Sequence, residues 1–192
     1  MVGEACKPWA NDGEMQWNAA RCGAVDADPG QPGDPCEVVG SSWSGIDSCD
    51  VGGFCWNVDL ESGVGECVAL CDGTKQEPAC PDGGTCVLAN DGYLPLCLPA
   101  CDPLTPTCDE GMGCYPGSYD DFVCLREGDD VYTDAPHTAC APGSFALVDG
   151  TCVPFCDLSA KTPCDDGFTC MPYFEGKAPA EYANVGGCLP TM

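Results

Sequence analysis

The chain has 192 residues and carries 31 acidic against six basic side chains, a formal charge of −25. Such a charge repels phosphate backbones and anionic lipid surfaces, which argues against nucleic acid and membrane-surface partners. No stretch reaches the ~20 apolar residues of a membrane helix, so we expect no membrane span.

The twenty cysteines make up just over a tenth of the chain, a level typical of disulfide scaffolds. No C-x-C or C-x-x-C pair occurs and His137 is the only histidine, so the spacings of zinc and thioredoxin-type sites are missing. We therefore expect ten disulfides. Because such bonds persist only in oxidising compartments, the sequence predicts a secreted, extracellular or outer cell-surface protein.

Residues 1–35 form an N-terminal segment in which Cys6 and Cys22 are expected to close their own loop. Its first 25 residues are rich in charge and contain no apolar run, so we interpret Met1 as standing in place of a removed signal. A short helix is predicted from Glu14 to Arg21, with Asp12 near its start and Gly23 beyond its end.

A four-cysteine unit then repeats along the chain. Its centre is a six-residue step between the second and third cysteines, and glycine occupies the fourth position of that step each time. The steps read CDVGGFC from Cys49, CPDGGTC from Cys80, CDEGMGC from Cys108 and CDDGFTC from Cys164. A glycine recurring at one place suggests a turn with positive φ, or no room for a side chain. The glycines are Gly52, Gly83, Gly111 and Gly167.

The units are expected at 36–70, 71–100, 101–124 and 156–192, and residues 125–155 resemble a truncated copy. Between the third and fourth cysteines of each unit the sequence predicts a β-hairpin, most clearly around Asn90-Asp91-Gly92. A similar hairpin is expected around Asp149-Gly150 in the truncated copy, and a long loop from Glu175 to Val185 in the last unit. The predicted fold is a small disulfide-rich array of β-hairpins and loops with little helix.

Four cysteines permit three pairings per unit, and sequence alone does not choose among them. We favour first with third and second with fourth, because this pins the hairpin to the segment before it, as in growth-factor-like modules. The predicted bonds are Cys6–Cys22, Cys36–Cys55, Cys49–Cys67, Cys71–Cys86, Cys80–Cys97, Cys101–Cys114, Cys108–Cys124, Cys140–Cys152, Cys156–Cys170 and Cys164–Cys188.

Four segments carry a resemblance to a known group of proteins: GDPCEVVG from Gly33, CDVGGFCWNVD from Cys49, LPLCLPACDP from Leu94 and CDEGMGCYP from Cys108. They resemble cysteine-rich secreted proteins of myxobacteria, among them lipoprotein-type ones. The likeness to epidermal-growth-factor modules is only loose, because C-x3-C replaces the close C-x-C ending. Some of these relatives carry a ribulose-phosphate epimerase label, but that enzyme needs a TIM barrel of ~250 residues, which this sequence does not encode.

The sequence gives little support for a catalytic site. His137 lies near Thr138 and Ser144, but no nucleophile elbow accompanies it, and a lone surface histidine is the plainer interpretation. Paired acids, as at Asp165-Asp166, rarely provide glycosidase geometry when they are neighbours in sequence. Calcium is the better hypothesis for a cofactor, with Asp120, Asp121, Asp129 and Asp130 as candidate ligands, although no EF-hand-type loop is present.

Aromatic side chains offer the other candidate surface. Trp56 and Tyr115 directly follow a third cysteine, as do Val87 and Met171, and we expect these four side chains in the core. Trp43 and Tyr119 lie in polar loops and are candidates for stacking on a glycan or protein partner. The loop with Lys177 is a candidate protease bait. We expect a non-enzymatic binding or structural protein, with a calcium-dependent scaffold, a protease inhibitor or a small hydrolase as alternatives.

Overall fold

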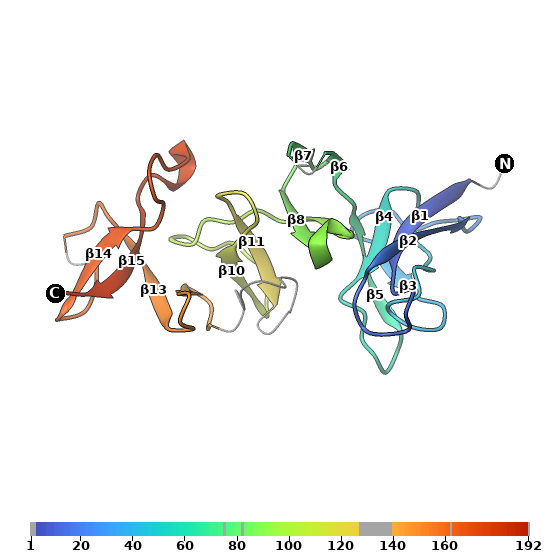
Figure 1. The fold of residues 1–192 in the computed structure, drawn as a ribbon, viewed down its shortest axis with the longest axis horizontal. Helices are drawn as coiled ribbons and strands as arrows, with labels where there is room; N and C mark the ends of the chain where they lie inside the picture. Colours follow the sequence, from blue (N-terminus) through green and yellow to red (C-terminus); the bar gives the residue numbers. More distant parts are fainter. Residues whose placement is uncertain (1–2, 75, 82, 127–139, 162, 192) are drawn as a thin grey trace. The chain divides into compact units, whose positions relative to one another are not determined.

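The computed structural model of the chain describes residues 3–74, 76–81, 83–126, 140–161 and 163–191. Its contacts divide the chain into two compact units, residues 1–98 and 99–192. Both are built from short antiparallel strands and turns, with 3-10 turns at Asn90–Gly92 (η1) and Ala180–Tyr182 (η3) (Figure 1). The predicted fold class, disulfide-rich β-hairpins with little helix, is confirmed. Across the described residues, no helix is long and apolar enough to span a membrane.

Each four-cysteine unit contains the expected hairpin between its third and fourth cysteines. In all four hairpins the register places these two cysteines directly opposite one another, as for Cys55 and Cys67. The paired strands are β4 (Gly53–Trp56) with β5 (Val64–Ala69), β8 (Thr85–Ala89) with β9 (Leu94–Leu98), β10 (Met112–Pro116) with β11 (Phe122–Arg126), and β14 (Phe168–Pro172) with β15 (Val185–Pro190).

The segment at the first cysteine of each unit lies beside the strand of the fourth cysteine. In the first and last units it forms the strands β3 (Pro35–Glu37) and β13 (Cys152–Asp157), which pair with β5 and β15. In the second and third units it makes single bridges, Leu70 to Leu96 and Ala100 to Val123. The first and second cysteines therefore bond to the third and fourth, and the ten disulfides join the same cysteine pairs that the sequence analysis favoured.

The recurring glycine of the six-residue step is explained by backbone conformation. Gly52, Gly83, Gly111 and Gly167 have φ between 76° and 89°, and a Cβ at any of them would meet no atom within 4 Å. Of the two explanations that the sequence left open, the turn with positive φ is the observed one, and crowding is absent at these positions.

The N-terminal segment forms a hairpin of β1 (Glu4–Trp9) and β2 (Ala19–Ala24) rather than the helix predicted from Glu14 to Arg21. The helix prediction is wrong because Cys22 lies opposite Cys6 in this ladder and bonds to it, which holds residues 19–24 extended. Asp12, expected near a helix start, instead accepts hydrogen bonds from the Glu14 N–H and the Asn18 side chain within the connecting loop.

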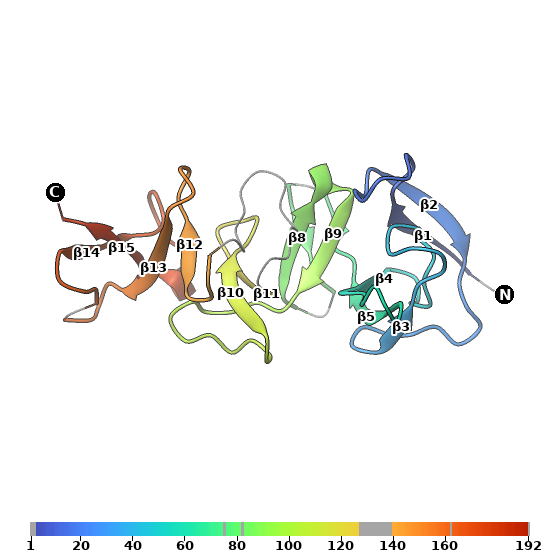
Figure 2. The same ribbon diagram turned by 90° about the horizontal axis from the view of Figure 1, so that it is seen from below.

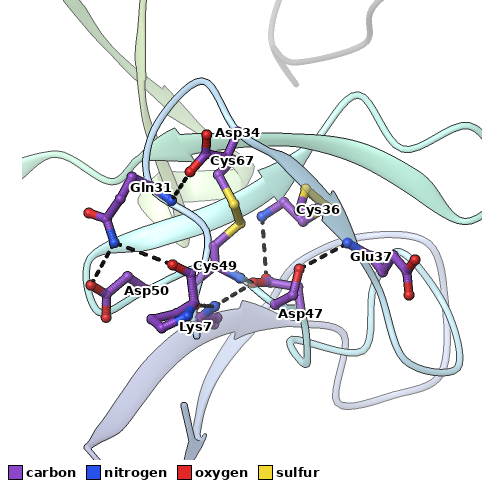
Figure 3. Close-up of a disulfide and its surroundings, with 12 residues drawn as sticks. Lys7, Gln31, Asp34, Cys36, Glu37, Asp47, Cys49, Asp50 and Cys67 are labelled. Atoms are coloured by element: carbon purple, nitrogen blue, oxygen red, sulfur yellow. Dashed lines mark hydrogen bonds and ion pairs between the residues drawn. A yellow bond between two sulfur atoms is a disulfide. The ribbon is translucent and has the colours of Figure 1, made fainter. Parts of the chain in front are cut away.

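A buried ion pair fastens this hairpin to the first four-cysteine unit (Figure 3). The Lys7 ammonium contacts the Asp47 carboxylate and donates a 2.7 Å hydrogen bond to the Cys49 carbonyl. Asp47 also accepts from the Cys49 and Cys55 N–H groups, and its side chain is only 2% exposed. The segment 1–35 thus packs as part of the first compact unit, which also includes the two-residue strands β6 (Asp72–Gly73) and β7 (Pro78–Ala79).

In the second compact unit, the truncated copy shares a sheet with the last four-cysteine unit. Its strand β12 (Ser144–Ala146) pairs with the first half of β13, and the second half of β13 pairs with β15, giving the order β12-β13-β15-β14 (Figure 2). A cluster of six rings packs against this sheet. The rings are Phe122, Phe145, Phe155, Tyr173, Phe174 and Tyr182.

The side chains that follow the third cysteines do not share one environment. Val87 and Tyr115 are fully buried, as predicted, and Trp56 is half-buried against Trp17 at 6.0 Å between ring centroids. Met171 is 48% exposed, so its prediction as a core residue is wrong. Met171 pairs with Gly187, which pairs in turn with Phe155, so Met171 shares a face with the aromatic cluster but lies on the outer strand β14.

Candidate binding site

A pocket on the second compact unit combines aromatic rings with carboxylates. It measures about 410 Å³ and is lined by the tip of the β12–β13 hairpin, the chain following β14 and one residue of the β10–β11 turn. The residues that line it are Asp120, Phe145, Ala146, Leu147, Val148, Tyr173, Phe174, Glu175 and Lys177. This volume lies in the range of small-ligand sites in proteins.

The aromatic walls are positioned by the shared sheet. Phe145 lies on β12 and Tyr173 directly follows β14, and their rings meet edge to face at 4.9 Å. Phe174 packs against Tyr173 at 5.0 Å. The approach of Phe145 requires Gly187 on β15, because a Cβ there would come within 2.7 Å of the Phe145 ring. The pocket therefore depends on a glycine that lies outside it.

The electrostatics of the pocket favour a cation. Burial, and then the nearby Asp120 carboxylate, raise the pKa of Tyr173 to about 12, so Tyr173 stays neutral and Asp120 contributes negative charge. Glu175 adds a second carboxylate to the wall, while Lys177 is the single basic residue among those that line it. A positive group here would lie among aromatic rings and carboxylates, the groups that take part in cation–π recognition.

The four aspartates predicted as calcium ligands do not share one environment. Asp120 is exposed and lines the pocket. Asp121 is directed back into its own turn, where its carboxylate accepts from the Tyr119 N–H and its carbonyl accepts from the Gly117 N–H. Desolvation raises the pKa of Asp121. Asp129 and Asp130 lie outside the described residues, so calcium binding stays a prediction.

The two loop aromatics singled out from the sequence are not brought together. Trp43 packs against Trp17 at 6.3 Å between ring centroids, and its carbonyl accepts from the Ala10 N–H. Trp17 also contacts Phe54 and Trp56, and its indole N–H is buried without an acceptor among the described residues. Trp43 thus belongs to a tryptophan cluster that joins the N-terminal hairpin to the first unit, whereas Tyr119 is 40% exposed in the β10–β11 turn.

The bait loop is anchored on both sides of its exposed lysine. Tyr173 and Phe174 belong to the ring cluster before it, and after it Tyr182 is buried and donates a hydrogen bond of 3.3 Å to the Cys101 carbonyl. Lys177 is exposed between these anchors, and inhibition of a protease stays a prediction. His137 and Thr138 lie outside the described residues, and Asp165 and Asp166 are both exposed.

The cysteines themselves form four tight groups. In each, three sulfur atoms lie within 4.8 Å of one another, close enough to hold a metal ion as thiolates. In this structure the sulfurs of all four groups are engaged in disulfides. Since the thiolate is the metal ligand, the groups are explained as pairs of neighbouring disulfides.

Sequence reasoning missed most of the aromatic pocket. Asp120 and Lys177 were chosen for other reasons, as a calcium ligand and a protease bait, Glu175 was named only as the first residue of the bait loop, and Phe145 and Phe174 were not chosen. The signal available was the clustering of Tyr173-Phe174-Glu175 directly after a hairpin strand. In comparisons with known proteins, no family model, no curated protein and no solved structure matched the chain.

Proposed function

We propose that the protein is a secreted or cell-surface, non-enzymatic binding module whose aromatic pocket takes a cationic group of an extracellular partner. The observation that carries the proposal is the pocket itself, in which Phe145, Tyr173 and Phe174 stand beside the carboxylates of Asp120 and Glu175. The ten disulfides support the compartment, because they require oxidising surroundings. The overall charge of −25 would draw basic partners toward the chain from a distance.

The disulfides make the scaffold rigid, so the pocket walls should be in place before a ligand binds rather than become ordered on binding. Disulfides Cys140–Cys152, Cys156–Cys170 and Cys164–Cys188 tie the strands that supply most of the pocket walls. Walls held in place before the ligand arrives lose little conformational freedom on binding, which favours affinity. Lysine and arginine side chains on a protein surface are the commonest cationic groups in such surroundings, so a basic protein is the proposed partner class.

The test is an NMR titration of the full, oxidised chain with tetramethylammonium, using tert-butanol as the neutral probe of similar shape. We expect the ring signals of Phe145, Tyr173 and Phe174 to shift and saturate with the cation and to stay unchanged with the alcohol. Asp120→Asn should weaken binding about threefold, the size of an exposed cation–π or charge contribution, and Asp166→Asn, a charge change outside the pocket, should not. Equal shifts with both probes, or binding that ignores Asp120→Asn, would refute the proposal.

A further inference from the structure

The Cys6–Cys22 disulfide differs from the other nine in what it joins. Among the ten disulfides, all of which lie in the described part of the chain, only this one links two register partners of a ladder. In the four-cysteine units the register partners, such as Cys55 and Cys67, bond instead to cysteines of the segment before the hairpin. Opening Cys6–Cys22 would therefore leave its two strands paired by main-chain hydrogen bonds, whereas opening a disulfide of a unit would remove a link between segments.

The same disulfide is also the most accessible one. Cys6 and Cys22 are both exposed, and each of the other nine bonds has at least one cysteine that is buried or half-buried. The reason is the alternation of side chains along a strand, because Ala5 and Lys7 are buried and Cys6 between them lies on the outer face of the hairpin. The β1–β2 ladder is a sheet of two strands only, so within the described residues no third strand pairs beside the bond.

The outer face around the bond is open and carries a negative charge. Of the neighbours on this face only Pro8 is buried, and the exposed ones are Glu4, Ala20 and Ala24. Glu4 is the single charged side chain of the ladder on this face, since Lys7 and Arg21 lie on the other one. Together with the charge of −25 on the whole chain, Glu4 repels an approaching anion and favours a reagent that carries a positive group.

We propose that Cys6–Cys22 is a thiol-exchange site, which a small thiol carrying an ammonium group reduces while the other nine disulfides persist. The thiolate attacks one sulfur, forms a mixed disulfide and releases the other sulfur as a thiolate. A second thiolate then displaces the first group, so two small thiols become one small disulfide, and their two protons pass to Cys6 and Cys22. Such attack requires access to the sulfur, and exposed disulfides are the labile ones.

Contacts that involve no sulfur make the exchange reversible. Lys7 of β1 contacts the Asp47 carboxylate and donates to the Cys49 carbonyl (Figure 3). Arg21 of β2 donates a 3.1 Å hydrogen bond to the Ser44 carbonyl. Both strands therefore stay docked on the first unit after reduction, with the two thiols opposite one another. The small disulfide produced can then re-form the bond by the reverse exchange.

The test uses the full oxidised chain and cysteamine, a thiol with an ammonium group. After a brief exposure at low ionic strength, free thiols are blocked with N-ethylmaleimide and located by peptide mass spectrometry. We expect Cys6 and Cys22 to be labelled at least about tenfold faster than any other cysteine, because access to the sulfur limits the attack.

The anionic thiol mercaptopropionate tests the charge preference. Each rate is divided by the rate of the same thiol with a neutral small disulfide, which removes the difference in intrinsic reactivity. On this scale mercaptopropionate should open Cys6–Cys22 about tenfold more slowly than cysteamine, the lower end of electrostatic steering. The difference should disappear at high salt.

Two double variants form a matched pair. Cys6→Ala with Cys22→Ala should remove the early-labelled thiols and leave all other cysteines as slow as before. Cys140→Ala with Cys152→Ala removes the other disulfide that lies outside the four-cysteine units and should leave the early labelling intact. Hydrogen exchange in β4 and β5 of the reduced native chain should stay slow, since the hairpin remains docked.

The proposal fails if another disulfide of the native chain opens as fast as Cys6–Cys22, if all ten open together, or if both thiols show equal scaled rates at low ionic strength. It also fails if cystamine, the disulfide of cysteamine, does not restore the Cys6–Cys22 bond once the thiol is removed. The site goes beyond the proposed function and does not depend on it, because the aromatic pocket lies in the other compact unit. The tetramethylammonium titration and the thiol labelling can therefore each fail alone.

Discussion

The two compact units use the same four-cysteine plan but fill the space beside it differently. In residues 1–98 the N-terminal hairpin supplies Lys7, which pairs with buried Asp47, and Trp17, which packs among Trp43, Phe54 and Trp56. In residues 99–192 the truncated copy supplies Phe145 and Phe155 to a cluster of six rings. The comparison teaches that the disulfides fix the backbone of each repeat, while the extra segment beside it decides the chemistry of the interior.

The largest expected difference concerns the buried ion pair, which only the first unit has among the described residues. Lys7→Met leaves the Asp47 carboxylate buried without its cation, and breaking such a pair costs about 3–5 kcal/mol of unfolding free energy. The loss should be confined to the first unit, measured as faster hydrogen exchange in β4 and β5 with β14 and β15 unchanged.

The double variant Lys7→Met with Asp47→Asn serves as the comparison for that prediction. It removes both charges and keeps an acceptor oxygen for one of the two N–H groups, Cys49 or Cys55, which bond to different oxygens of Asp47, so it should recover part of the lost stability. Lys161→Met removes an exposed lysine in the other unit and should have little effect. A Lys7→Met protein as stable as the parent would show that the pair contributes nothing to the docking of the hairpin.

Removing one disulfide from each unit tests whether the sulfur scaffold is equivalent in both. Cys49–Cys67 and Cys108–Cys124 are both second-to-fourth bonds, with sequence separations of 18 and 16. Loop entropy predicts a loss of about 3 kcal/mol for each when both cysteines become alanine. Urea unfolding followed in each unit should therefore give nearly equal losses, and a difference above ~1 kcal/mol would locate extra stabilisation around one bond.

How much of this was predictable depends on whether the signal was local. The cysteine spacing and the Asn90-Asp91-Gly92 turn are local, and they led to the observed hairpins and to the same disulfide pairs. The Lys7–Asp47 pair joins residues 40 positions apart, and the aromatic pocket brings the truncated copy together with the last unit. The spacing of cysteines along the chain does not indicate which of these distant residues will meet. The helix prediction at Glu14 failed because the Cys6–Cys22 bond outweighed weak capping signals.

The residue after each third cysteine is buried in some units and exposed in others, so the loss of unfolding free energy on its substitution should differ between units. Val87 is fully buried, so Val87→Ala should cost about 2 kcal/mol, between the effects of removing one methylene and a whole leucine side chain. Met171 is 48% exposed, so Met171→Thr should change the unfolding free energy by less than about 0.5 kcal/mol. Denaturant melts of both variants give the comparison, and a large loss for Met171→Thr would return this residue to the core.

The last expected difference is a pH dependence that the second unit should show through its ring cluster. The pKa of Tyr173 is raised from 10.0 to about 12, chiefly by burial and secondarily by Asp120. Between these values the unfolded chain loses the Tyr173 proton first, so the unfolding free energy of the second unit should fall as the pH rises from 10 toward 12. Tyr173→Phe should abolish this contribution, and Asp120→Asn should lower the Tyr173 pKa only slightly because burial is the larger cause. The Tyr173 ring signal, followed by NMR against pH, measures the pKa directly, and a midpoint at or below 10.0 would mean that the ring cluster does not exclude water from this hydroxyl.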